Sequence, residues 1–299
     1  MTPPPDAPDS DTAGSSEAGV RFARRAQIRR RQRRIAGAVV AVVVVGAGAT
    51  LALSGGGGAG VKATAATTTT VAPTSSTTLP DQGPFDIATT KGSLLKVYSS
   101  PTATASVVAT VPAKTDYGFP STLLVNPDEP SRPAGWLPVT VPLKKPNNIP
   151  GWVQTTDVTT AQTGYAIRVS LSAHTLVLLH DGVTVLTTKV IIGAPATATP
   201  VGRFYLTDPL NCNKLSVPGY PVAQCGSAYG AFAIGTSGES EMLDSFDGTM
   251  PQIALHGTDL PDTSLGQDLS NGCIRMPNDV IVQIAKITPL LGTPVTITA

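Results

Sequence analysis

A run of 19 residues without a charged side chain, Ile35–Leu53, most constrains what this chain can fold into. Its length is close to the ~20 apolar residues that a helix needs to cross a bilayer. Eight of the twelve arginines lie just before it, between Arg21 and Arg34, and basic residues in such a position stay on the cytoplasmic side. The pattern predicts a single-pass transmembrane helix with a cytoplasmic N-terminus and the rest of the chain outside the cell membrane. The alternative is a long secretory signal peptide that is cleaved.

The segments on either side of this run contain no pattern that could form a core. Residues 1–34 predict a disordered cytoplasmic tail with the arginine cluster, and residues 54–83 predict a low-complexity linker. The net charge is +1, yet after residue 34 there are 13 basic and 16 acidic residues, a balance of −3. Because a nucleic-acid-binding protein would carry its positive charge on the folded part, we expect no nucleic-acid partner.

Residues 84–160 contain short apolar runs separated by turn residues, which predict a small all-β module. Two Gly-Trp pairs, Gly135-Trp136 and Gly151-Trp152, recur within it. The pattern resembles a bacterial SH3-like barrel. The alternative is a β spacer in which both tryptophans belong to the core.

The β pattern strengthens in residues 164–299. Alternating apolar residues surround an Asp181-Gly182 pair, which is a hairpin signal. The segment 278–286 predicts the one short helix, with Asn278 as its N-cap. Residues 207–250 are Gly- and Ser-rich and predict a long, mostly irregular segment that covers the site. The predicted fold class is therefore mostly β with one short helix.

Three cysteines occur in a chain that we expect to be exported. Cys212 and Cys225 lie close together in the same irregular segment and are expected to form a disulfide, the alternative being two free thiols. Cys273 then remains unpaired. A thiol reacts as the thiolate, so it needs a base or a positive charge nearby.

Of the three histidines, His256 is the candidate base because it ends an apolar run shortly before Cys273. His174 and His180 flank turns and are expected to be surface or strand residues. No Cys or His spacing fits a structural zinc site, and no glycine-rich loop joins a strand to a helix. We therefore expect neither a metal nor a cofactor.

These residues carry a resemblance to a known family. His256-Gly257-Thr258 and the later run from Ser270 to Met276 (SNGCIRM) resemble the core motif of the YkuD-type L,D-transpeptidase catalytic domain. Supporting stretches at Leu171–Gly182, Thr199–Phe204 and Tyr229–Phe232 occur in the same order. The resemblance covers about residues 164–299, and the upstream layout resembles membrane-anchored actinobacterial members. It implies a β-sandwich-like catalytic domain.

The resemblance also implies a reaction on peptidoglycan stem peptides in the cell wall. Cys273 would attack the carbonyl between the third residue and the terminal D-alanine of a tetrapeptide, releasing D-alanine and forming an acyl-enzyme. The side-chain amine of a neighbouring stem's third residue would then complete the cross-link. His256 would act as general base and acid, the Gly257 carbonyl would orient its imidazole, and the N–H groups of Gly272 and Cys273 would stabilise the oxyanion. Carbapenem-type inhibitors are expected to bind.

The chain departs from many members of the family at Asn271, where those members have histidine, so His256 must serve as the base alone. Ser270, Asn271 and Arg275 are expected at the substrate site. Ser270 would fix the loop by a hydrogen bond, and Arg275 would either position the substrate or brace the loop. Two alternative functions remain open at this point: an L,D-carboxypeptidase that uses water as the acceptor, and a non-enzymatic cell-wall-binding protein.

Overall fold

The computed structural model describes residues 82–299 except 213–216, 218, 221 and 224. The predicted cytoplasmic tail, the predicted transmembrane helix at Ile35–Leu53 and all but the last residues of the predicted linker lie outside the described residues. Within the described part of the chain, no helix is long and apolar enough to cross a membrane.

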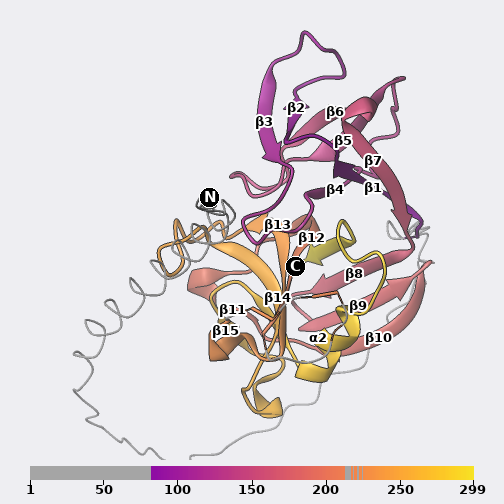
Figure 1. The fold of residues 1–299 in the computed structure, drawn as a ribbon. Coiled ribbons are helices and arrows are strands. Elements are labelled where there is room, and N and C mark those ends of the chain that lie inside the picture. The colour runs from indigo at the N-terminus through magenta and orange to yellow at the C-terminus, as the bar shows by residue number, and fades with distance from the viewer. Residues whose placement is uncertain (1–81, 213–216, 218, 221, 224) are drawn as a thin grey trace, which may run out of the picture. The chain divides into compact units, whose positions relative to one another are not determined.

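The first described region, up to residue 163, consists of two small antiparallel sheets (Figure 1). Five of its strands, β2 to β6, fall on the predicted apolar runs, whereas β1 at the start and β7 at the end are further strands. One sheet has the order β4-β1-β7 and the other β3-β2-β6-β5. The strands are β1 (Phe85–Thr90), β2 (Leu94–Tyr98), β3 (Val107–Pro112), β4 (Thr122–Leu124), β5 (Trp136–Thr140), β6 (Pro150–Gln154) and β7 (Val158–Thr163), with the short 3-10 helix η1 (Thr155–Asp157) before β7. The likeness to an SH3-like barrel stays a prediction.

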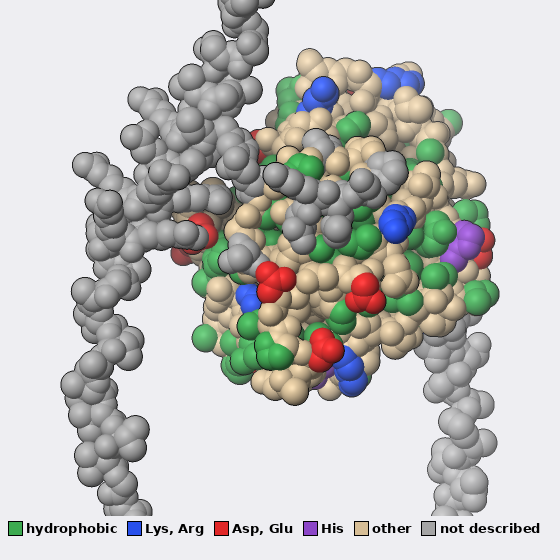
Figure 2. All heavy atoms as spheres, turned by 60° about the horizontal axis from the view of Figure 1, so that its bottom comes forward, with side chains coloured by type: hydrophobic (Ala, Val, Ile, Leu, Met, Phe, Trp, Pro, Cys, Tyr) green, Lys and Arg blue, Asp and Glu red, His purple; other side chains and the backbone are tan. Residues whose placement is uncertain are grey.

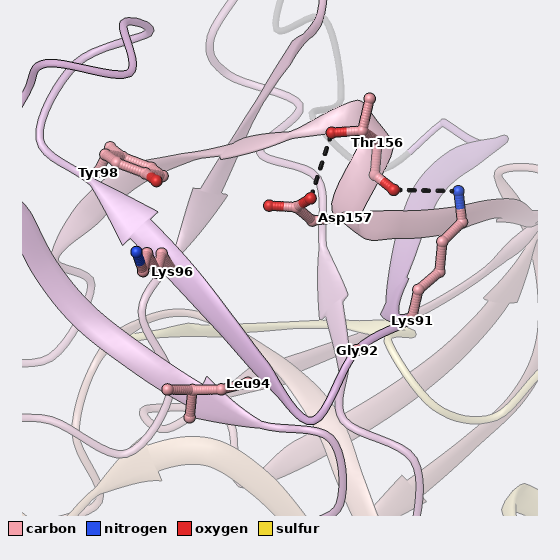
Figure 3. Close-up of a pocket in the computed structure, with 7 residues that line it drawn as sticks. All are labelled: Lys91, Gly92, Leu94, Lys96, Tyr98, Thr156 and Asp157. Carbon is pink, nitrogen blue, oxygen red and sulfur yellow. Dashed lines mark hydrogen bonds between the residues drawn. The ribbon is translucent and has the colours of Figure 1, made fainter.

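The two tryptophans of the Gly-Trp pairs lie in the same sheet. Trp136 meets Tyr98 edge-on, with ring centroids 5.3 Å apart, and Trp152 pairs in register with Tyr98 and Pro138. Both indoles are partly buried, which agrees with a packing role. Beside them, β2 and η1 border a surface hollow of about 460 Å³ (Figure 3).

The second region is built on an eight-stranded sheet with the order β10-β9-β8-β17-β12-β13-β14-β16. The pairs β17–β8 and β14–β16 are parallel and the other neighbours are antiparallel. A further parallel pair joins β11 to β15. The strands are β8 (Tyr165–Ser170), β9 (Thr175–His180), β10 (Val183–Lys189), β11 (Ile192–Gly193), β12 (Gly202–Asn211), β13 (Phe232–Glu239), β14 (Gln252–Gly257), β15 (Asp268–Ser270), β16 (Ile274–Met276) and β17 (Pro294–Thr298).

The Asp181-Gly182 pair forms the predicted hairpin turn. Both residues have positive φ, 49° and 77°, as a two-residue type I′ turn requires. His180 and Val183 are paired across the turn, which joins β9 to β10. Glycine and aspartate tolerate this backbone better than branched residues do, so the local sequence is sufficient to set the register.

The interpretation of residues 207–250 as a mostly irregular segment is wrong in part. β12 extends to Asn211, and all of β13 lies inside this segment, where the two strands pair. All eight residues of β13 are buried, so the strand has no alternation of apolar and polar residues to detect. Most of the described residues before and after β13 in this segment are irregular, and the 3-10 helix η3 (Ser227–Tyr229) precedes β13.

The predicted helix exists as α2 (Asn278–Ile284) and packs against β13 and β14. Its apolar side chains at Ile281 and Ile284 are completely buried. The predicted N-cap role of Asn278 is wrong, because Pro277 occupies the N-cap position and no side chain caps the helix. The Asn278 amide is directed elsewhere, as described below.

The described part of the chain contains two clusters of buried hydrophobic side chains. One is formed within the second region, from β8 to β17 and α2. The other joins the two regions, because Ala166, Leu179 and Tyr205 pack with core residues of the first region such as Leu95 and Val153. Figure 2 shows one face of the molecule, on which Lys and Arg side chains are scattered among hydrophobic and neutral ones rather than gathered into a stripe.

Candidate active site

Two paired strands place the candidate nucleophile and base together. β14 ends in His256-Gly257, and β16 begins directly after Cys273. The strands are parallel, with His256 opposite Arg275. His256 and Arg275 therefore share one face of the sheet. Cys273 directly precedes β16, and its thiol contacts the Gln252 carbonyl at the start of β14.

His256 is held by its own backbone neighbourhood. The side chain is 2% exposed, and its Nδ1 lies 2.7 Å from the carbonyl oxygen of Gly257. Because a carbonyl only accepts, Nδ1 carries the proton and Nε2 remains as the acceptor. The Tyr229 ring packs on the imidazole at a centroid distance of 4.9 Å. The predicted orienting contact from Gly257 is thus present.

Burial lowers the pKa of His256 from 6.5 to about 4, and the positive charge of Arg275 acts in the same direction, while the Gly257 hydrogen bond acts against both. The imidazole is therefore neutral at physiological pH. A neutral imidazole with a free Nε2 is the form that can accept a proton.

Cys273 is the free cysteine of the described residues, and its side chain is partly exposed. The other two cysteines, Cys212 and Cys225, form the predicted disulfide. The Cys273 thiol donates a long hydrogen bond, 3.9 Å, to the carbonyl of Gln252. Burial raises the pKa of this thiol, although the backbone of Ala254 and the charge of Arg275 lower it.

Within the described residues, no hydrogen bond joins the Cys273 thiol to His256. The two pKa directions are consistent with this geometry, since a raised thiol pKa and a lowered imidazole pKa both favour the neutral pair. The two pKa shifts therefore favour a neutral Cys273 thiol and a neutral His256 imidazole over a thiolate–imidazolium ion pair.

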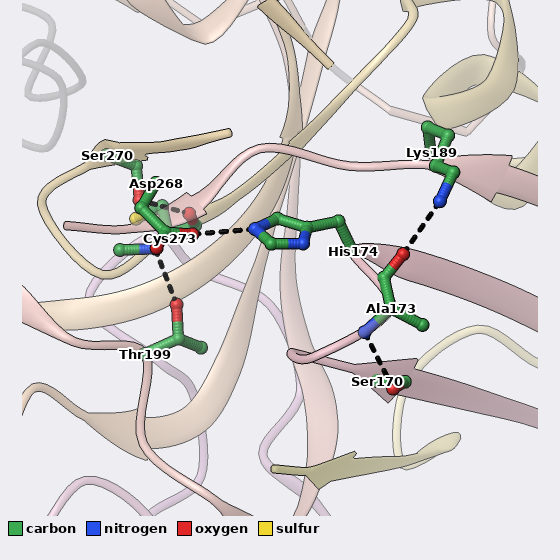
Figure 4. A network of polar contacts seen from close by, with 9 residues as sticks. Ser170, Ala173, His174, Lys189, Thr199, Asp268, Ser270 and Cys273 are labelled. Carbon is green, nitrogen blue, oxygen red and sulfur yellow. Dashed lines mark hydrogen bonds and ion pairs between the residues drawn. The ribbon is translucent and has the colours of Figure 1, made fainter. Parts of the chain in front are cut away.

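The loop before Cys273 is fixed by two hydroxyl groups (Figure 4). Ser270 Oγ accepts the Gly272 N–H at 3.1 Å and donates to the Cys273 carbonyl at 2.6 Å. Thr199 Oγ1 donates to the Gly272 carbonyl at 2.8 Å and accepts the Gly193 N–H at 2.9 Å. Gly272 has φ +108°, a conformation that side chains rarely adopt.

These bonds bear on the predicted roles of the loop residues. Ser270 is 1% exposed, and its hydroxyl is used within the loop, as the loop-fixing role predicts. The Gly272 N–H is already bonded to Ser270, so in this structure it is not free for an oxyanion, and its predicted role stays a prediction. No acceptor for the Cys273 backbone N–H is found among the described residues. Asn271 is exposed.

The comparisons with known proteins fit this site. Residues 164–297 match the family model of the L,D-transpeptidase catalytic domain, YkuD. This region is a YkuD-type L,D-transpeptidase catalytic domain. YkuD of Bacillus subtilis (strain 168) is 33% identical over 133 residues, which are 44% of this chain and 65% of the relative. YkuD of Bacillus licheniformis is 33% identical over 134 residues, 45% of this chain and 66% of the relative. The chain therefore spans slightly less than two thirds of the length of these curated relatives.

Solved structures of proteins named L,D-transpeptidase are similar to this chain at low sequence identity and low TM-score. An L,D-transpeptidase from Mycobacterium tuberculosis gives a TM-score of 0.36 at 16% identity, over 60% of this chain and 90% of that chain. L,D-transpeptidase 3 from Mycobacterium tuberculosis, in complex with a faropenem-derived adduct, gives 0.35 at 16% identity, over 56% and 92% of the two chains. At TM-scores of this size the superpositions add nothing to the family assignment.

Arg275 is a positively charged residue that acts on both Cys273 and His256. Its backbone bridges to Ile191 in both directions at 2.9 Å, and its side-chain Nε is buried without a hydrogen-bond partner among the described residues. An unpaired buried donor is costly to leave unsatisfied. The Arg275 charge lowers the pKa of both Cys273 and His256, so it favours the thiolate and the neutral base together.

We expect Arg275→Gln to raise the pKa of His256 and the pKa of Cys273, because the substitution removes the positive charge that lowers both. At a fixed pH near 7, alkylation of the thiol by a small neutral reagent should slow by roughly tenfold for each unit of increase. Arg275→Lys, which keeps the charge, should retain most of the rate. Equal alkylation rates in the wild type and in Arg275→Gln would show that the guanidinium charge does not reach the thiol.

The other two histidines lie outside the Cys273–His256 pair, as predicted. His174 Nε2 contacts Asp268 Oδ1 at 2.7 Å, at the start of the strand that leads into Ser270 (Figure 4). His180 stacks on Tyr165 at a centroid distance of 4.3 Å and lies 3.6 Å from Asp181. Among the described residues, no three His, Cys, Asp or Glu side chains form a group that could hold a metal ion.

Sequence reasoning missed several residues that build the transpeptidase site. Thr199 and Tyr229 lie in stretches that resemble the family, but no role followed from their spacing. Asn278 was assigned to the helix terminus. Their contacts join segments far apart in the sequence, and a residue type alone does not show which distant backbone group it will meet.

Proposed function

We propose that this protein is an L,D-transpeptidase that cross-links peptidoglycan stem peptides through a cysteine acyl-enzyme. The observation that carries the proposal is the pairing of β14, which carries His256, with β16, which begins directly after the free Cys273, within a YkuD-type catalytic domain. The substrates are a tetrapeptide donor stem and a neighbouring stem whose third residue supplies a side-chain amine.

The first half of the proposed reaction forms the acyl-enzyme. Cys273 Sγ attacks the carbonyl carbon between the third residue and D-alanine, while the thiol proton moves to His256 Nε2. The oxyanion faces the Cys273 N–H. The carbon–nitrogen bond then breaks, the His256 proton passes to the leaving amine, and D-alanine departs from a thioester.

The second half transfers the acyl group to the acceptor. The neutral amine of the neighbouring stem attacks the thioester carbonyl and gives up a proton to His256 Nε2. The carbon–sulfur bond breaks, the proton returns to Cys273, and a new amide bond joins the two third residues. Over both halves one peptide bond is broken and one amide bond is formed, so the reaction needs no cofactor.

The resting protonation states favour general-base catalysis over a preformed ion pair. The pKa of Cys273 is raised by burial and that of His256 is lowered to about 4, so proton transfer in the resting enzyme is unfavourable. The transfer becomes favourable only as the sulfur–carbon bond forms, because bonding to carbon makes the S–H proton more acidic. Ser270 and Thr199 hold the attacking loop in place for this step.

We propose that the predicted helix at Ile35–Leu53 anchors the enzyme in the cell membrane, with the catalytic domain on the cell-wall side. The support is the charge-free run after the arginine cluster. Cysteine labelling of the intact cell provides the check. A membrane-impermeant thiol reagent should reach a cysteine introduced in the linker but not one introduced at Ser15.

The proposed reaction is tested with the full chain and purified disaccharide-tetrapeptide stems, followed by mass spectrometry. We expect D-alanine release together with a cross-linked dimer, and neither product with Cys273→Ala. Tripeptide without dimer would indicate a carboxypeptidase that uses water as the acceptor. Intact tetrapeptide, with retention of the protein on peptidoglycan, would indicate the non-enzymatic wall-binding alternative.

A further inference from the structure

The side-chain amide of Asn278 lies between two segments that meet at His256. Its Oδ1 accepts the Ala231 N–H at 2.7 Å, and its Nδ2 donates to the Thr258 carbonyl at 3.0 Å. Ala231 follows the segment that brings Tyr229 against the imidazole, and Thr258 follows His256 and Gly257. One amide therefore links both segments to helix α2.

The helix itself does not require these bonds. Asn278 is the first residue of α2, and no side-chain cap is formed there. The helix is instead held by Ile281 and Ile284, both 0% exposed, against the sheet that carries His256. The buried helix thus gives the amide a fixed position.

Glycines on both segments leave room for this amide. A Cβ added to Gly257 or to Gly230 would overlap Asn278 Oδ1. Gly257 also provides the carbonyl that accepts the His256 Nδ1–H. The Asn278 amide therefore lies against the same residue, Gly257, whose carbonyl determines the tautomer of His256.

We propose that Asn278 is a positioning residue for His256: by holding the Thr258 carbonyl and the Ala231 N–H, it fixes the Gly257 carbonyl on Nδ1 and leaves Nε2 as the acceptor. This inference rests on the proposed function, in which Nε2 takes the Cys273 proton. Nδ1 and Nε2 would exchange roles if the carbonyl turned away, and Nε2 would then carry a proton and could not act as the base.

The test uses the full chain in detergent, labelled with ¹⁵N-histidine, because nitrogen chemical shifts distinguish the two tautomers. In Asn278→Ala we expect His256 to lose the Nδ1–H tautomer as its single form. The rate of Cys273 acylation by a carbapenem should fall by tenfold or more, since small misplacement of a catalytic group has large kinetic effects. Asp279→Ala is the matched control, because this residue is exposed in the same helical turn, and it should stay within twofold of the wild type.

A second variant tests the same contact from the other side. Gly257→Ala places a methyl group where Asn278 Oδ1 lies, so we expect a similar loss, and the two losses should be less than additive when the substitutions are combined. Wild-type tautomer and acylation rate in either folded variant would overturn the positioning role. If the wild type itself is not acylated, the proposed function fails, and the ¹⁵N spectra of Asn278→Ala still decide the positioning role because they need no reaction.

Discussion

Cys273→Ala is expected to abolish covalent labelling of the protein by a carbapenem, and His256→Ala to slow it by a factor on the order of 10² or more. The alanine at 273 removes the only free thiol among the described cysteines. His256→Ala removes the buried neutral imidazole on β14, the strand that pairs with β16 directly after Cys273. The measurement is the appearance of the adduct mass with time, at several pH values.

Controls for this prediction use the other histidines and Asn271. His174→Ala and His180→Ala should label at nearly the wild-type rate, because their rings contact Asp268 and Tyr165 rather than the thiol. Asn271→His should change the rate little. A large rescue of His256→Ala by Asn271→His would instead move the base to position 271, and a normal rate in His256→Ala would mean that another group activates the thiol.

Much of the fold could be predicted where local sequence determines local structure. The Asp181-Gly182 turn needed only residues that accept positive φ, and strands β2 to β6 of the first region followed from short apolar runs. β13 could not be found in this way. Its sequence, FAIGTSGE, has no period of two, and all eight residues are buried. The strand lies in the interior of the sheet, paired with β12 on one edge and β14 on the other, and its burial is a property of the assembled domain.

In the candidate site, too, local features could be predicted from the sequence and long-range contacts could not. Cys273 and His256 followed from cysteine counting and from a motif in which Gly272 and Gly257 mark tight backbone positions. The hydrogen bonds that support them did not follow. Thr199 reaches Gly272 across 73 positions, and Asn278 reaches Ala231 across 47. A pattern read along the chain has no way to represent these pairings until the sheet and α2 are in place.

A second large effect is expected in the pH dependence of stability. Burial lowers the pKa of His256 to about 4 from the 6.5 of an exposed imidazole, so between these values the unfolded chain binds a proton that the native state does not. The free energy of unfolding should therefore be independent of this histidine's titration above pH 6.5 and should decrease as the pH falls from 6.5 toward 4. The 2.5-unit difference between 6.5 and 4 corresponds to about 3 kcal/mol.

His256→Gln should remove this component, because glutamine fills similar space and does not titrate. Denaturant unfolding of the disulfide-intact protein, at steps between pH 7 and pH 4, measures the effect as the difference between the two curves, in which the carboxylate contributions common to both proteins cancel. Leu255→Ala, at the neighbouring buried position, is the matched control and should lower stability about equally at every pH. Parallel curves for His256→Gln and the wild type would mean that the imidazole is protonated in the folded protein at mildly acidic pH, and the neutral base required by the proposed mechanism would then be lost below pH 6.5.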